Sequence, residues 1–246
     1  MAALVLLIVI AVGIALAPTL APYAYDAQDM NLIGLPDPPS AAHLFGTDPL
    51  GRDGFSRVLW GGRVSLVVGL ASALVATAVG TAVGALAGFF GRPIDTALMR
   101  VTDVALSMPA LPLVLLISGL VRPNVPILVL LIGSLAWMTT ARLVRAQFLT
   151  LRERDFVEAA RALGVGSARL IWRHILPNAI APVTVSATLA VGQAILLESA
   201  MSFFGFGVQP PTPTWGNLLN EATPYLDTAP WLAVPPGLLI FLTVLA

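Results

Sequence analysis

The stretch ERDFVEAARALGVGSARLIWRHILPN, residues 153–178, is the only long charged segment in an otherwise apolar chain. Seven of the thirteen basic residues lie in it or just before it: Arg142, Arg145, Arg152, Arg154, Arg161, Arg169 and Arg173. Apolar stretches flank the segment on both sides, and arginine clusters between membrane spans are typical of the cytoplasmic face. The sequence therefore predicts a cytoplasmic loop, residues 142–178, between two spans.

The first half of this loop predicts a short helix over Asp155 to Leu163. Its apolar residues recur at helical spacing and form one stripe. The stripe consists of Phe156, Ala159, Ala160 and Leu163. Gly164 then supplies the left-handed position that ends a helix. The small alanine pair would let another surface approach closely, so this helix is a candidate docking element.

The second half predicts another short helix, residues 168–175, with Ser167 as its N-cap. Pro177 lacks a backbone donor and disfavours helix at Leu176, so we expect the chain to turn there before the next span. The two short helices would together form a compact projection at the membrane face.

These residues resemble the EAA loop of ABC-importer permeases, the membrane subunits that dock on an ATPase. The resemblance rests on Glu158-Ala159-Ala160, on Gly164 and on Leu176-Pro177. One position departs from the general pattern, because His174 stands where Ile is common; RHILPN is nevertheless similar to the branch that serves peptides and nickel. By resemblance, 158–164 is the coupling helix, and the coupling residues are Asp155, Phe156, Glu158, Ala159, Ala160, Arg161, Leu163, Gly164 and Pro177. The alternative is a generic amphipathic helix lying on lipid headgroups.

Composition supports a membrane protein: 57% of residues are hydrophobic and 11% charged, against roughly 25% charged in soluble domains. The chain has no Cys and no Lys. A P-loop ATPase needs a lysine on the phosphates, so any ATP-driven work must come from a partner. The formal net charge is zero, and nothing indicates nucleic-acid binding.

The apolar stretches predict an all-α integral membrane fold with six transmembrane helices. They cover residues 2–21, 64–91, 104–121, 125–141, 179–197 and 229–246. A signal peptide is the alternative for the first, although it lacks a positive n-region. Arginine placement favours a cytoplasmic amino end. We expect residues 1–62 to form the first helix and an external loop, and 63–246 the permease core, with its last helix truncated at Ala246.

Two external motifs also resemble the peptide/nickel branch. The segment 45–53, FGTDPLGRD, is similar to its G-T-D-x-L-G-R-D signature, and 203–216, FFGFGVQPPTPTWG, to its Pro-rich last loop. The candidates for contact with a binding protein are Asp48, Arg52, Asp53, Gln209 and Trp215. We expect the Pro-rich segment to be extended and Trp215 to be an interfacial anchor.

Three features lie within the predicted spans or at their ends. Gly80, Gly84 and Gly88 form two small-xxx-small steps that let a neighbouring helix approach, and we expect packing within this subunit. Asp103 is expected to pair with Arg100 near the interface. Glu198, with Ser202 one turn later, lies at the outer end of the fifth span; a translocation-path role and a structural hydrogen-bonding role both remain open.

The chain is thus identified as a member of the dipeptide/oligopeptide/nickel ABC-importer permeases, as the C-type subunit in the cytoplasmic membrane of a prokaryote. The resemblance implies a B-type permease partner, two ATPase subunits or one fused ATPase, and an extracytoplasmic substrate-binding protein. ATP and magnesium would be used by the ATPases, with no cofactor or metal bound by this chain. Peptides are the expected substrate, with nickel or haem as alternatives. The rival functions are an ion-gradient-driven secondary transporter or channel, and a purely structural membrane anchor.

Overall fold

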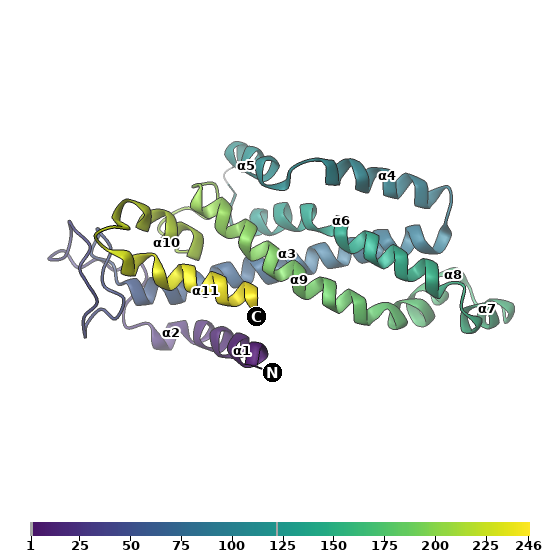
Figure 1. Ribbon diagram of the computed structural model, residues 1–246, viewed down its shortest axis with the longest axis horizontal. Helices are drawn as coiled ribbons and strands as arrows, with labels where there is room; N and C mark the ends of the chain where they lie inside the picture. Colours follow the sequence, from purple (N-terminus) through teal and green to yellow (C-terminus); the bar gives the residue numbers. More distant parts are fainter. Residues whose placement is uncertain (1, 122) are drawn as a thin grey trace. The chain divides into compact units, whose positions relative to one another are not determined.

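The computed structural model describes residues 2–121 and 123–246, and no β-strand occurs among them (Figure 1). Two isolated β-bridges, Ile33–Leu50 and Thr47–Asp53, fasten the long segment that follows the first helices. Arg122, between the spans expected over 104–121 and 125–141, lies outside the described residues. The helical fold class predicted from the sequence is confirmed.

The secondary structure consists of eleven α-helices and three short turns of other helix types within the described residues. In chain order these are α1 (Ala2–Ala15), α2 (Ala17–Leu20), α3 (Gly54–Phe90), α4 (Ile94–Ser107), α5 (Ala110–Val121), α6 (Val125–Leu151), α7 (Asp155–Ala162), α8 (Ser167–Arg169), the π-helix η1 (Leu170–Ile175), α9 (Leu176–Phe203), α10 (Trp215–Ala222), the 3₁₀ turns η2 (Thr223–Tyr225) and η3 (Pro230–Leu232), and α11 (Val234–Leu245).

Three helical stretches in the described residues are long and apolar enough to cross a membrane: α3, α6 and the continuous stretch Ser167–Phe203. The pair α4 and α5 passes the same test together but is bent by 81°. Met108 takes an extended conformation at this break, as a residue before proline prefers, so Pro109 accounts for the bend. The predicted first and last spans form shorter apolar helices, Ala3–Ala15 and Pro230–Leu245. Length and composition thus give three spans, or four with the bent pair.

By their contacts the described residues fall into two compact units. Unit 1 comprises the chain up to residue 70, residues 114–129 and residues 192–246; unit 2 comprises residues 71–113 and 130–191. In unit 1, a core of Ile10, Ile14, Trp215 and Ile240 joins α1, α10 and α11. Gly62 lies against Ile14 and Trp215, where an added Cβ would come within 2.8 Å of Ile14.

Glycines bring α3 and α6 together in unit 2. A Cβ at Gly80 would lie 2.6 Å from the Trp137 carbonyl, and one at Gly88 would lie 2.5 Å from the Phe148 Cβ. Gly84 faces the Ala141 carbonyl just as closely. No side chain fits at these distances, so the stripe 80–84–88 packs within this chain and lets two backbones approach.

Two predicted helix boundaries are wrong. The span expected from residue 64 begins at Gly54 instead, as part of a single helix of 37 residues, α3. Gly61 lies inside α3 without interrupting it. A Cβ added at this position would lie 3.2 Å from the Thr214 backbone, so glycine allows close packing here. The span expected from residue 104 also begins earlier, because α4 starts at Ile94.

Candidate functional site

The predicted docking helix is α7, and it ends as the sequence predicts. Gly164 has a φ of +78°. Its N–H donates to the Arg161 carbonyl at 3.0 Å, and the Val165 N–H donates to the Ala160 carbonyl at 3.1 Å. This pair of bonds is a Schellman motif, which requires a left-handed residue at the Gly164 position. An added Cβ at Gly164 would meet nothing within 4 Å, so backbone conformation alone favours glycine here.

One face of α7 is anchored in the core of unit 2. Val157 is fully buried and Ala160 is 7% exposed. They belong to a cluster drawn from α3, α6, α7, η1 and α9: Ala85, Val144, Phe148, Val157, Ala160, Leu170, Ile171, Ile175, Ala179 and Val183. Val165, which follows the Schellman turn, packs against the same cluster. The base of α7 is therefore continuous with the helices that carry it.

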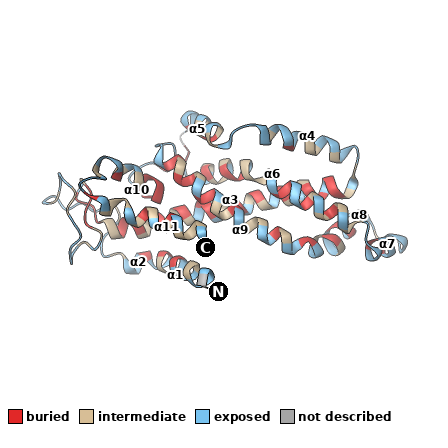
Figure 2. Cartoon of the chain, in the orientation of Figure 1, coloured by how far each residue is buried: buried red, intermediate tan, exposed pale blue. Residues whose placement is uncertain are grey.

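The other face of α7 is open, as its pale blue colour in Figure 2 shows. Phe156 is 41% exposed and Leu163 is 85% exposed. The remaining predicted coupling residues, Asp155, Glu158, Ala159, Arg161 and Gly164, are exposed as well. Of the four residues in the predicted apolar stripe, only Ala160 faces the core, and the other three are exposed. Val157 and Ala160 form the face of α7 that packs against its own subunit. Phe156 and Leu163 form an apolar surface that stays exposed.

The predicted turn at Pro177 is wrong, since Ser167–Phe203 is one unbroken helical stretch. Pro177 cannot donate to the carbonyl four residues earlier, and the wider π-helical turn η1 ends at Ile175, just before Leu176 and Pro177. The Asn178 side-chain amide donates to the His174 carbonyl at 2.6 Å. Ser167 is the first helical residue rather than the N-cap, which is Gly166. Pro177 itself is exposed.

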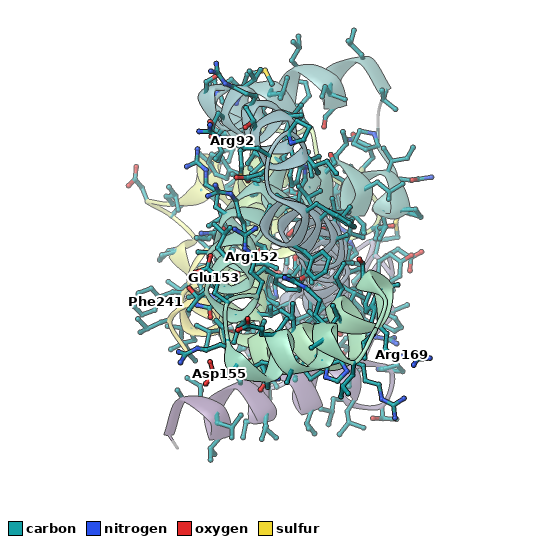
Figure 3. All side chains as sticks on the ribbon, turned by 90° about the vertical axis from the view of Figure 1, so that its right-hand side faces the viewer. Arg92, Arg152, Glu153, Asp155, Arg169 and Phe241 are labelled. Atoms are coloured by element: carbon teal, nitrogen blue, oxygen red, sulfur yellow. The ribbon has the colours of Figure 1, made fainter. Side chains whose placement is uncertain are left out.

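Two arginines that the sequence did not single out brace the base of this loop. The Arg152 guanidinium donates to the Gly88 carbonyl at 3.0 Å, in the last turn of α3. Arg145 binds Asp95 with two donors: its Nε contacts Oδ1, and a terminal nitrogen lies 2.7 Å from Oδ2. Figure 3 shows Arg152 and Glu153 at the junction that leads to Asp155 and α7. The only sequence signal for Arg145 and Arg152 was the number of arginines near this loop, which the cytoplasmic location predicted for the loop already explained.

The predicted Asp103–Arg100 pair is not formed. Asp103 instead binds Arg142 of α6 at 2.5 Å, and both side chains are more than half exposed. Asp103 and Arg142 lie on different helices, so this ion pair links α4 to α6 within unit 2.

The FGTDPLGRD motif builds a charged cluster in unit 1. Asp48 Oδ2 accepts from Arg52 Nε at 2.6 Å and from Arg57 at 2.5 Å. Glu221 of α10 accepts from the same two arginines at 3.0 Å and 2.6 Å. The Arg52, Arg57 and Asp48 side chains are under 10% exposed. Two buried arginines between two carboxylates fasten this segment to α10, a role that the sequence could not assign because Glu221 is distant.

Asp53 has a separate local role. Its Oδ2 accepts from the Ser56 N–H at 2.8 Å, which caps the first turn of α3, and its Oδ1 lies 2.9 Å from His43 Nδ1. Asp53 is only 2% exposed. A carboxylate at a helix amino end satisfies an otherwise unpaired backbone donor.

Trp215 is a core residue, and the prediction of an interfacial anchor is wrong. It is fully buried, and its Nε1 donates to the Val58 carbonyl at 3.1 Å. It opens α10, whose N-cap Thr214 exchanges hydrogen bonds with Asn217. Gln209 is exposed and donates to the carbonyls of Gly205 and Gly207.

Glu198 is fully buried within unit 1 and has two serine donors. Ser65 of α3 donates to Oε2 at 2.8 Å, and Ser202 donates to Oε1 at 2.7 Å. Ser65 also accepts from the Trp215 N–H at 3.3 Å. This network ties α3, α9 and the start of α10 together, which favours the structural role; the path role of Glu198 and Ser202 stays a prediction.

The family model for binding-protein-dependent transport system inner membrane components matches residues 80–246. A putative peptide permease protein of Brucella suis biovar 1 (strain 1330) is 41% identical over 224 residues, covering 90% of this chain and 74% of the relative. The oligopeptide transport system permease protein OppC of Escherichia coli (strain K12) is 40% identical over 240 residues, covering 97% of this chain and 80% of that protein.

A solved structure with the same fold is an inward-facing form of the MetNI methionine ABC transporter. Its TM-score is 0.60 at 19% identity, and the match covers 75% of this chain and 88% of that one. The family match and the two relatives agree with the fold, so the chain belongs to the family of binding-protein-dependent transport system inner membrane components.

Proposed function

We propose that this chain is a membrane subunit of an ATP-driven importer that moves peptides across the cytoplasmic membrane of a prokaryote. The names of the relatives, a peptide permease and an oligopeptide permease, support the substrate class. In this proposal the two shorter apolar helices, Ala3–Ala15 and Pro230–Leu245, are the first and last of six spans, and the amino end is cytoplasmic.

The observation that carries the proposal is the two-sided character of α7. Its Val157 side is fixed in the core of unit 2, whereas Phe156 and Leu163 are exposed. An apolar surface on a short, well-anchored helix is suited to a groove on another protein. Because the sequence lacks the lysine of a P-loop, we propose that the groove belongs to a partner ATPase, which uses ATP and magnesium while this chain remains non-catalytic.

The complex would contain further subunits. We propose a second, B-type permease beside this one, two ATPase subunits or one fused ATPase on the cytoplasmic side, and a substrate-binding protein outside. Closure of the ATPases on ATP would displace α7, and the shared cluster around Phe148 and Ile175 would pass this movement to α3, α6 and α9. Close packing makes such a core transmit displacement rather than absorb it.

The test is peptide uptake by the complete complex in liposomes, with the binding protein outside and ATP inside. Uptake should persist when an uncoupler dissipates the ion gradient and should stop without ATP. Glu158→Lys should abolish uptake, because it reverses a charge on the exposed side of α7, while the protein stays in the membrane. Asp103→Asn is a matched control, since it changes an exposed carboxylate remote from α7 in sequence.

The opposite result would favour the ion-gradient-driven rival: uptake that collapses with the uncoupler although ATP is retained. Normal uptake by the Glu158→Lys variant would refute the docking role of α7. Dipeptides, longer peptides, a nickel chelate and haem are offered in parallel, and only preferential uptake of a peptide supports the proposed substrate class.

A further inference from the structure

Helix α4 is held within unit 2 by charged pairs rather than by an apolar core. Thr102 is the one buried residue of this helix, all of which is described. Val101 and Val104 are more than 60% exposed. Two carboxylates of α4 bind two arginines of α6: Asp95–Arg145 and Asp103–Arg142. Apolar burial is non-directional, whereas these pairs fix which part of α4 meets which part of α6.

The two pairs differ in burial and geometry. The Asp95 side chain is 14% exposed and Arg145 is 33% exposed, and Arg145 uses two donors on both carboxylate oxygens. Such forked contacts are directional and stronger than single ones. The Asp103–Arg142 pair is more than half exposed and has one short contact. An exposed pair of this kind contributes little, so Asp95–Arg145 is the stronger link.

The Arg152 contact lies at the same end of unit 2. Arg152 follows the last residue of α6, and its guanidinium binds the Gly88 carbonyl near the carboxyl end of α3. A cation at this position also meets the negative end of the helix dipole. Arg145 and Arg152 thus connect the α6–α7 junction to the start of α4 and the end of α3, the two helices joined by the turn at Gly91.

We propose that Arg145 and Arg152 are positioning residues that make the α3–α4 turn follow α7 when the ATPase moves it. This inference rests on the proposed function. Any displacement of α7 acts on the end of α6 through Val157 and Phe148, which share one core. The forked Arg145–Asp95 contact then carries it to the first turn of α4, and Arg152 carries it to the last turn of α3. Without these contacts α4 would not follow the movement of α7, because Thr102 is the one buried residue that packs α4 against the rest of unit 2.

The experiment uses the complete transporter in liposomes and measures peptide uptake and ATP hydrolysis together. Arg145→Gln and Asp95→Asn should each lower the peptide taken up per ATP by about tenfold, the factor expected for loss of one charge-assisted contact, while ATP hydrolysis continues. The exchanged pair, Asp95→Arg with Arg145→Asp, should restore most of the ratio. Arg142→Gln, in the exposed pair on the same two helices, is the matched control and should leave the ratio unchanged.

A spectroscopic measurement tests co-movement directly. The chain has no native cysteine, so spin labels at Thr96→Cys on α4 and Thr150→Cys on α6 report a single distance. Both positions are exposed. The distance should be the same in the nucleotide-free and ATP-bound complex, and it should differ between the two states once Arg145→Gln is introduced.

Three results would overturn the inference. They are a label distance that changes between states without any Arg145 substitution, an Arg145→Gln variant with normal uptake per ATP, and an exchanged pair that folds but recovers nothing. The first needs no charge variant and decides the question even if Arg145→Gln fails to assemble. Failure of the proposed function is recognised separately, because the unsubstituted complex would then show no ATP-dependent uptake.

Discussion

Leu163→Ala offers a quantitative test of docking through α7. Leu163 is 85% exposed, the most exposed large apolar residue of the α7 region. The substitution removes three carbon atoms from the side chain. Burying them against the ATPase would contribute about 2.4 kcal/mol of binding free energy, at ~0.8 kcal/mol for each carbon. Multiplied by the exposed fraction of Leu163, the expected loss of binding free energy is about 2 kcal/mol. This loss corresponds to a roughly 30-fold larger dissociation constant for the ATPase.

The same substitution should leave the stability of the permease almost unchanged, because the Leu163 side chain contributes little to its own core. Its backbone bond to the Ala159 carbonyl at 3.1 Å does not depend on the side chain. Val157→Ala is the matched control: Val157 is fully buried, so this change should destabilise the permease by about 1–2 kcal/mol. Any loss of ATPase binding in the control should then follow from unfolding.

The assay is binding of the purified ATPase to the permease pair in nanodiscs, with thermal unfolding measured in parallel. An ATPase affinity for the Leu163→Ala variant within twofold of the unsubstituted protein would refute the idea that this residue enters an ATPase groove. Destabilisation of the Leu163→Ala variant by as much as Val157→Ala would show instead that Leu163 is a core residue.

Three further substitutions test other parts of the structure. Gly164→Ala should destabilise the loop by about 1–2 kcal/mol, because alanine is disfavoured at φ +78°; faster proteolysis at this loop would show it, and unchanged proteolysis would contradict the Schellman assignment. Glu198→Leu should cost about 2–5 kcal/mol of stability, because Ser65 and Ser202 lose their acceptor; a thermal unfolding midpoint no lower than that of the unsubstituted protein would argue against the network. Glu221→Ala leaves two buried arginines with one carboxylate, Asp48, and should cost about 3 kcal/mol; Glu221→Gln, which keeps an acceptor, should be milder in the same thermal measurement.

The parts of the fold that were predicted correctly depend on local signals. Gly164 was assigned because few other residues suit a left-handed helix end. Local chemistry also explains the bend at Pro109, where Met108 is extended as a residue before proline prefers. Pro177 carries the same local signal without breaking its helix. The π-helical turn η1 precedes it, and nothing in the local composition announces a π turn.

The wrong assignments concern which neighbour a side chain meets. Hydrophobic periodicity placed Phe156, Ala160 and Leu163 in one stripe, yet only Ala160 of these faces the core, beside Val157, which the stripe did not include. Periodicity cannot distinguish a face for the subunit's own core from a face for a partner. Trp215 was assigned to the interface for a similar reason, and its burial depends on α1 and α11, which are far away in the sequence.

The partnerless face of α7 also has a consequence for synthesis in the cell. A copy of this subunit made without its ATPase would present Phe156 and Leu163 to water, and surplus copies would be prone to associate through them. The proposed function therefore implies that permease and ATPase must be produced in matched amounts. The apolar surface that binds the ATPase would otherwise remain exposed and promote aggregation of the unassembled subunit.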